Sequence, residues 1–133
     1  MHRMIGETMM TKMMDGMINP TLDELFAKQI NFQLEVLKKR DSEIEVLPVD
    51  DTHWFSYHIQ AMIEELGEVL KADKRWKTHR NARYERDEKL DEMADVFITF
   101  MNLAIYSDFD AKDIGDAVIK KIKENEERLE NYE

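Results

Sequence analysis

Two pairs of carboxylates have the residue types and the spacing that metal chemistry requires. Glu65 and Glu68 form one pair, and Glu92 and Asp95 form the other. Residues three apart lie on the same face of a helix, so each pair presents two carboxylates to one side. If the two helices pack antiparallel, the four side chains can converge. Mg²⁺ prefers oxygen ligands and keeps places for water and phosphate oxygens, so the pattern predicts a Mg²⁺ site in which Mn²⁺ can substitute.

The helix expected from Asp87 to Tyr106 carries the second pair. It is apolar around most of its circumference, so we expect other helices to bury it, including helices of a second subunit. Its remaining polar stripe contains Glu88, Glu92, Asp95, Thr99, Asn102 and Tyr106. This stripe faces either an internal polar site, where a metal ion would balance the carboxylates, or water, as on an ordinary amphipathic helix.

Four helices are expected after a flexible, Met-rich leader at residues 1–20. Thr21 with Glu24 forms a capping-box pattern at the first helix, and Asp110 is the expected N-cap of the last, with Asp113 in its first turn. The expected helical ranges are 21–40, 53–77, 87–106 and 110–131. Moderate connections favour an all-α, antiparallel four-helix bundle, completed by oligomerisation. Residues 21–133 would then form a single helical domain.

The last helix offers a complement to the acidic pairs. Lys121, Asn125 and Arg128 lie in or beside its apolar stripe. Two cations and a neutral amide donor suit phosphate oxygens. The alternative is that they stabilise the helix C-terminus or form local ion pairs with nearby glutamates.

Aromatic and amide side chains near the acidic pairs are candidates for contact with a base. Trp54 and Trp76 could stack on one, and Gln33 could read its edge. The alternative for a tryptophan is core or rim packing. Lone histidines such as His58 have no Glu-x-x-His partner and are not assigned to a metal.

Composition narrows the classes of partner. The chain has 133 residues, which suits one domain. Its formal charge of −10 disfavours nucleic-acid binding, which needs basic patches. It has no Cys, so disulfides and thiolate metal sites are excluded, and a cytoplasmic location fits. No apolar run reaches the roughly 18 residues that suggest a membrane span.

The acidic pairs also resemble a family signature. Glu65-Leu-Gly-Glu68 followed by Glu92-Met-Ala-Asp95 resembles the ExxE…ExxD pattern of the all-α nucleoside triphosphate pyrophosphatases. This superfamily includes MazG-like enzymes and dimeric dUTPases. The resemblance covers roughly residues 21–131.

Two further segments extend the resemblance. Residues 121–128, Lys-Ile-Lys-Glu-Asn-Glu-Glu-Arg, resemble the later Lys…Asn…Arg element of the family. Trp76-Lys77 and the earlier His53-Trp54 are similar to the dUTPase branch. Residues 96–98, Val-Phe-Ile, stand where an aromatic-His pair commonly follows in that branch, so the preferred base stays open.

The resemblance implies hydrolysis between the α and β phosphates of dUTP or another (deoxy)nucleoside triphosphate, giving a monophosphate and pyrophosphate. It also implies a homodimer or homotetramer. The acidic composition and the lack of a long apolar run predict no nucleic-acid and no membrane partner. Carried over by motif, the catalytic, Mg²⁺-binding residues would be Glu65, Glu68, Glu92 and Asp95, and the phosphate-binding residues would be Lys121, Asn125 and Arg128. The residue types alone, and not the resemblance, suggest the base-binding residues Trp76, Gln33 and Trp54.

Two points about this activity stay open. One carboxylate would act as general base, and Glu65 is favoured because it borders the apolar face, where desolvation raises basicity. The alternative function is a noncatalytic helical homo-oligomer with an interaction or regulatory role. A di-iron bundle is disfavoured, because such bundles usually need Glu-x-x-His motifs and the sequence has none.

Overall fold

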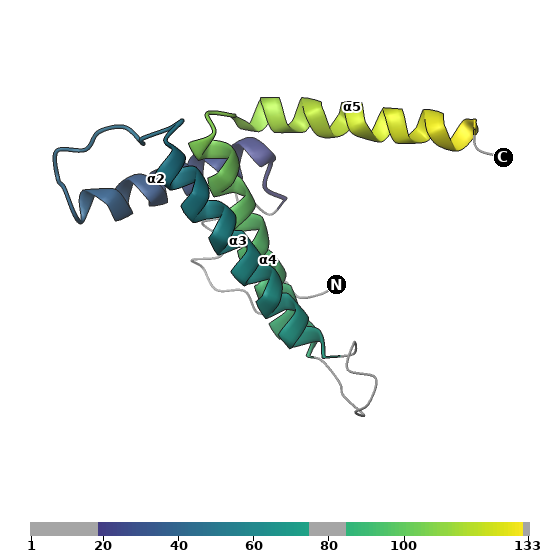
Figure 1. The fold of residues 1–133 in the computed structure, drawn as a ribbon, viewed down its shortest axis with the longest axis horizontal. Helices are drawn as coiled ribbons and strands as arrows, with labels where there is room; N and C mark the ends of the chain where they lie inside the picture. The colour runs from purple at the N-terminus through teal and green to yellow at the C-terminus, as the bar shows by residue number, and fades with distance from the viewer. Residues whose placement is uncertain (1–18, 75–84, 132–133) are drawn as a thin grey trace.

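The computed structural model describes residues 19–74 and 85–131, and these form four α-helices joined by loops (Figure 1). The helices are α2 (Leu22–Lys38), α3 (Thr52–Asp73), α4 (Arg86–Tyr106) and α5 (Ala111–Glu130). No strand occurs within these ranges, so the predicted all-α class is confirmed for them. None of these helices is long and apolar enough to cross a membrane.

Side-chain caps fix where three of the helices begin. Thr21 and Glu24 form the predicted capping box at α2, with each side chain bonded to the other's backbone N–H. Asp110 and Asp113 form a second capping box at α5. Asp51 caps α3 by accepting from two backbone N–H groups. Such caps satisfy donors that have no partner within the helix, and the predicted caps at Thr21 and Asp110 are confirmed.

The end of α3 differs from the prediction. The periodicity predicted a helix to Lys77, but α3 ends at Asp73 because Lys74 adopts a left-handed backbone conformation with φ 67°. Its N–H donates to the carbonyl of Leu70, as in a left-handed C-cap. Hydrophobic periodicity carries no signal for this stop, because left-handed caps are usually glycine or asparagine.

α3 and α4 form the closest helix pair in the described chain and run antiparallel (Figure 1). At one end, the Nζ of Lys89 lies 2.6 Å from a carboxylate oxygen of Asp73. At the other end, the rings of His58 and Tyr106 stack with centroids 4.5 Å apart. These contacts set the register of the pair and determine which side chains face each other between the two helices.

α2 crosses the pair near the end of α4, and the buried apolar core lies where α2, α4 and α5 meet. The core residues are Phe26, Met101, Ala104, Ile105 and Ala111. The N–H of Asp50 donates to the carbonyl of Tyr106 at 2.8 Å, which ties the connection before α3 to the same end. The core therefore holds one end of the α3–α4 pair.

α5 extends away from the α3–α4 pair (Figure 1). Its apolar residues Val118, Ile122 and Leu129 are exposed. One chain therefore forms a helix pair with α2 and α5 attached at one end, and its described residues do not by themselves complete the predicted four-helix bundle. A bundle would need helices from another chain.

The orientation of α4 decides between the two alternatives for its polar stripe. Its polar stripe turns inward, and Thr99, Asn102 and Tyr106 are buried. Its apolar side faces outward, with Leu90 47% and Met93 50% exposed. A solvent-facing stripe is therefore wrong for this half of α4, and the space between α3 and α4 is polar.

Candidate metal centre and adjoining cavity

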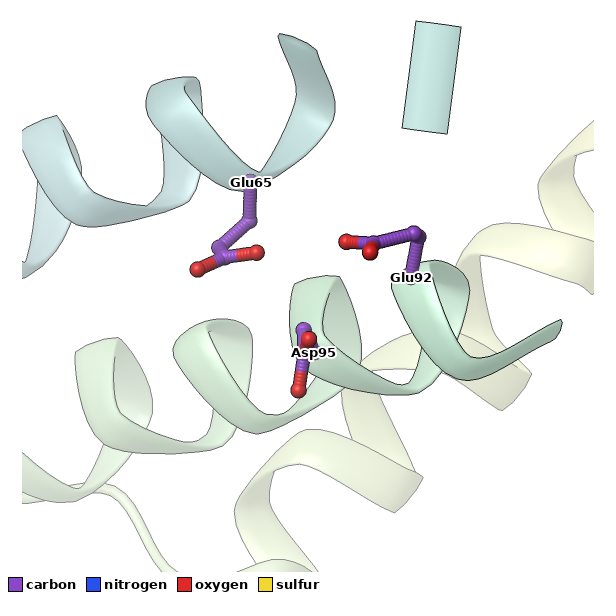
Figure 2. A group of neighbouring side chains, drawn as sticks. All are labelled: Glu65, Glu92 and Asp95. Atoms are coloured by element: carbon purple, nitrogen blue, oxygen red, sulfur yellow. The ribbon is translucent and has the colours of Figure 1, made fainter. Parts of the chain in front are cut away.

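Three carboxylates from two helices meet between α3 and α4. One oxygen each from Glu65, Glu92 and Asp95 lies within 4.8 Å of the other two. Figure 2 shows Glu65 reaching from α3 toward the two acidic residues of α4. The predicted convergence of carboxylates from neighbouring helices is present for these three residues.

Helical spacing places these side chains between the helices. Glu92 and Asp95 are three residues apart on α4, and Thr99 follows one turn later on the same inward face. On α3, Glu65 lies two turns after His58, which is buried. The buried residues of each helix thus indicate which way the carboxylates point.

The carboxylates of this cluster disfavour one another's charge. Partial burial, followed by the negative charges of Asp95 and Glu92, raises the pKa of Glu65 above its usual value. Partial burial, followed by the charges of Asp95 and Glu68, raises the pKa of Glu92 in the same way. A bound cation would relieve both effects, because opposite charge favours the ionised form.

The size and chemistry of the cluster fit a small divalent cation. Mg²⁺ binds oxygen at 2.0–2.1 Å, so ligands on opposite sides of one ion are about 4.2 Å apart. The three carboxylate oxygens lie within 4.8 Å of one another, so small side-chain rotations would bring them to this span. Carboxylate oxygens are also the ligand type that suits this ion. The residues present therefore fit Mg²⁺ or Mn²⁺.

Glu68 lies beside the cluster but outside this group of three. Its side chain is 42% exposed, and one carboxylate oxygen lies 3.7 Å from the Nζ of Lys71. Its charge still contributes to the raised pKa of Glu92. The structure thus brings three of the four predicted carboxylates together and leaves the fourth at the edge.

The predicted phosphate-binding residues lie elsewhere in the same chain. Lys121, Asn125 and Arg128 are exposed on α5, which leads away from α3 and α4. Lys121 pairs with Glu124 at 3.5 Å, and Arg128 donates to Asn125 at 3.2 Å. One chain does not bring these side chains to its own carboxylates.

A cavity of about 520 Å³ lies next to the cluster, among α2, α3 and α4. Trp54 and Gln33, two of the predicted base-binding residues, line it, whereas Trp76 lies outside the described residues. Its lining residues are Phe32, Gln33, Val36, Leu37, Arg40, His53, Trp54, Tyr57, His58, Ala61, Thr99 and Asn102.

The cavity lies about one helical turn from the carboxylates. Ala61 and Thr99 line it, and each lies four residues, or about 6 Å along its helix, from a carboxylate of the cluster. A second hollow of about 540 Å³ on α3 is lined by Glu65 and shares Tyr57 and Ala61 with the first. The aromatic cavity and the acidic cluster are therefore adjacent parts of one region.

Hydrogen bonds hold the amides at this cavity. The Nε2 of Gln29 donates to the Oδ1 of Asn102 at 2.8 Å, and the hydroxyl of Tyr106 donates to the Oε1 of Gln33 at 2.9 Å.

The interpretation of the sequence assigned no role to His58. Its position seven residues before Glu65 placed it on the same face of the helix, and that signal could have identified it.

No model of a known protein family matches the chain, and comparisons with curated proteins and with solved structures likewise find no match.

Proposed function

We propose that the chain is a Mg²⁺-dependent nucleoside triphosphate pyrophosphohydrolase. It would cleave between the α and β phosphates of a (deoxy)nucleoside triphosphate, dUTP or another noncanonical nucleotide, and release a monophosphate and pyrophosphate. The observation that carries the proposal is the meeting of Glu65, Glu92 and Asp95 beside an aromatic-lined cavity. The resemblance of the acidic motifs to the all-α pyrophosphatases supports it.

The carboxylates have separate tasks in this reaction. Bound Mg²⁺ would neutralise phosphate charge and lower the pKa of a water molecule. Glu92 and Asp95 would hold the ion from α4, with Glu68 joining them from the edge of the cluster. Glu65, which reaches the same point from α3, would share the ion and accept the proton of the attacking water.

The cavity would hold the base of the same nucleotide. Trp54 offers an aromatic face, and Gln33 is anchored through Tyr106. Because the cavity and the cluster lie about one helical turn apart, a nucleotide can place its base in one and its phosphates at the other. Two neighbouring sites of different chemistry thereby bind one amphipathic substrate.

A homodimer or homotetramer would complete the site. The outward apolar residues of α3 and α4, such as Leu66 and Phe97, and those of α5 need a partner to bury them. Packing α5 of one chain near α3 and α4 of another would bring Lys121, Asn125 and Arg128 to the phosphates. Closed, symmetric assemblies of this kind are the usual form of soluble homo-oligomers.

A panel of nucleotides tests the proposed reaction. The purified protein is incubated with Mg²⁺ and canonical or modified triphosphates, and pyrophosphate and phosphate are measured separately. We expect pyrophosphate from at least one nucleotide, a loss of at least about 100-fold in Asp95→Asn, and normal activity in the control Glu64→Gln. Release of phosphate alone, or equal rates in Asp95→Asn and the wild type, would contradict the proposal.

The second candidate is a noncatalytic helical homo-oligomer with an interaction or regulatory role. The observation that favours it is the exposed apolar surface of α3, α4 and α5. It predicts no pyrophosphate from any nucleotide and a melting temperature that Mg²⁺ leaves unchanged. The enzyme predicts metal-linked stabilisation, because an ion that binds only the folded chain raises its stability.

A further inference from the structure

His58 is a buried polar residue whose hydrogen-bonding groups are unused. Its side chain is 3% exposed, and neither Nδ1 nor Nε2 has a partner among the described residues. Buried polar groups are nearly always hydrogen-bonded, and leaving one without a partner is costly. A phenylalanine at this position would avoid that cost, so the histidine calls for an explanation.

Stacking, rather than hydrogen bonding, fixes the imidazole. The ring stacks on Tyr106 with centroids 4.5 Å apart and on Trp54 at 6.1 Å. Tyr57 meets it edge-on at 5.0 Å. The ring plane is therefore set, while both buried nitrogens have no hydrogen-bond partner among the described residues.

His58 also lines the cavity beside the carboxylate cluster. The cavity of about 520 Å³ lies in the range of small-molecule sites, and its amides Gln33 and Asn102 are already anchored by hydrogen bonds. Aromatic rings and a few fixed polar groups are what a planar ring with a polar edge requires. Tyr57, which also lines the cavity, is 55% exposed.

We propose that His58 is a specificity-determining residue that hydrogen-bonds the edge of a nucleobase seated in this cavity. The inference rests on the proposed function and deepens it, because it names the residue that recognises the heterocyclic ring. Burial lowers the pKa of His58, so the imidazole is neutral near pH 7. A neutral imidazole offers one donor and one acceptor, and a nucleobase edge can pair with either.

Binding of nucleosides without divalent metal tests this role separately from catalysis. Uridine, cytidine, adenosine and guanosine are titrated into the full chain in EDTA by calorimetry. We expect at least one to bind, His58→Phe to weaken that binding about 10-fold, and His58→Gln to retain most of it. A deoxyriboside carrying difluorotoluene, which keeps the shape of thymine but hydrogen-bonds poorly, should bind the wild type and His58→Phe equally.

Thermal melts separate recognition from a structural role. We expect His58→Phe to melt at a higher temperature than the wild type, because it removes two unpartnered buried nitrogens. Equal nucleoside binding by the wild type and His58→Phe would overturn the proposal. Lost binding in both variants together with lower melting temperatures would also overturn it, because His58 would then be structural.

The outcomes for binding and hydrolysis are distinguishable. A wild-type protein that hydrolyses Mg²⁺-nucleotides but binds no nucleoside would overturn the role of His58 and leave the proposed function standing. A protein that binds nucleosides through His58 but hydrolyses no triphosphate would overturn the proposed function alone.

Discussion

At the scale of single residues, the cluster of Glu65, Glu92 and Asp95 places like charges close together. Such an arrangement destabilises a folded chain unless a cation or a proton balances it. Acidic residues that destabilise the fold by repelling one another are candidates for a functional role, because they do not contribute to stability. The loss of stability caused by this repulsion is measurable, because substituting one carboxylate or binding a cation should restore it.

Replacing Glu65 with Gln should have opposite effects with and without metal. In EDTA we expect Glu65→Gln to raise the melting temperature, because one charge of the repelling cluster is removed. In Mg²⁺ we expect the wild type to gain stability and the variant to gain much less. Thermal melts followed by circular dichroism measure both.

Glu64→Gln is the matched control, because Glu64 adjoins the cluster residue but is exposed on α3. It changes the net charge equally and should keep the response to Mg²⁺. Identical melts for the two variants in both buffers would argue against a metal site at Glu65.

The raised pKa values of Glu65 and Glu92 should change how the folding stability depends on pH. A raised carboxyl pKa means that the folded chain binds more protons than the unfolded chain. In EDTA this contribution therefore favours folding as pH falls through the raised pKa values, and it is lost as pH rises through them. Stabilisation by Mg²⁺ should follow the opposite trend, because protons compete for the same oxygens.

Urea unfolding of the wild type and a Glu65→Gln/Glu92→Gln variant between pH 4 and pH 7 isolates this contribution. The difference between the two proteins removes the effect of other titrating groups, such as His58 and Asp110. A wild type that loses stability relative to the variant as pH falls would contradict the assigned direction.

At the scale of elements, the sequence predicted the helices and their caps well, but it did not predict which side of each helix packs against the others. Periodicity and the boxes at Thr21 and Asp110 are local signals, and they placed four helices near their observed positions. The inward face of α4 depends on what α2 and α3 present to it. Because Asn102 and Tyr106 have hydrogen-bond partners on α2, their polar side packs inward, and helix periodicity alone cannot show this.

Gly67 tests the packing of α3. A glycine between Glu65 and Glu68 leaves room for another surface to approach the helix, but a Cβ at this position would have nothing within 4 Å in the described chain. We therefore expect Gly67→Ala to stabilise the isolated chain by about 0.5–1 kcal/mol, the usual cost of glycine inside a helix. Urea unfolding measures the change.

Gly115→Ala on α5 is the matched control, because its Cβ would also have nothing within 4 Å. We expect both variants to gain similar stability when the protein is dilute. A Gly67→Ala variant that is markedly less stable than the wild type would show that another surface approaches α3 at this point.

At the scale of the whole molecule, α3, α4 and α5 each expose large apolar residues, such as Leu66, Phe97 and Ile122. The sequence predicted that α4 needs helices around it but could not show that the chain supplies too few. The same limit applies to Lys121, Asn125 and Arg128, whose distance from the carboxylates depends on where α5 packs. Local spacing identified the acidic residues, whereas assembly would decide whether the basic ones reach them.

Phe97 on the outer side of α4 is 42% exposed and tests the proposed assembly. We expect the wild type to sediment as a dimer or tetramer, and Phe97→Gln to shift it toward monomer because an apolar contact is lost. Val46→Gln is the control, since Val46 is also exposed but lies in the loop before α3. A wild type that stays monomeric at high concentration would contradict an oligomeric site.

The most direct test of the account is whether the carboxylates of α3 and α4 hold a divalent ion. Titrating the protein into Mn²⁺ and following the free-ion signal by electron paramagnetic resonance measures this without any assumption about substrate. The account predicts saturable binding that Glu92→Gln and Asp95→Asn each weaken at least about 10-fold, as expected when a ligand is lost. Binding that is absent from the wild type, or unchanged in both variants, would contradict it.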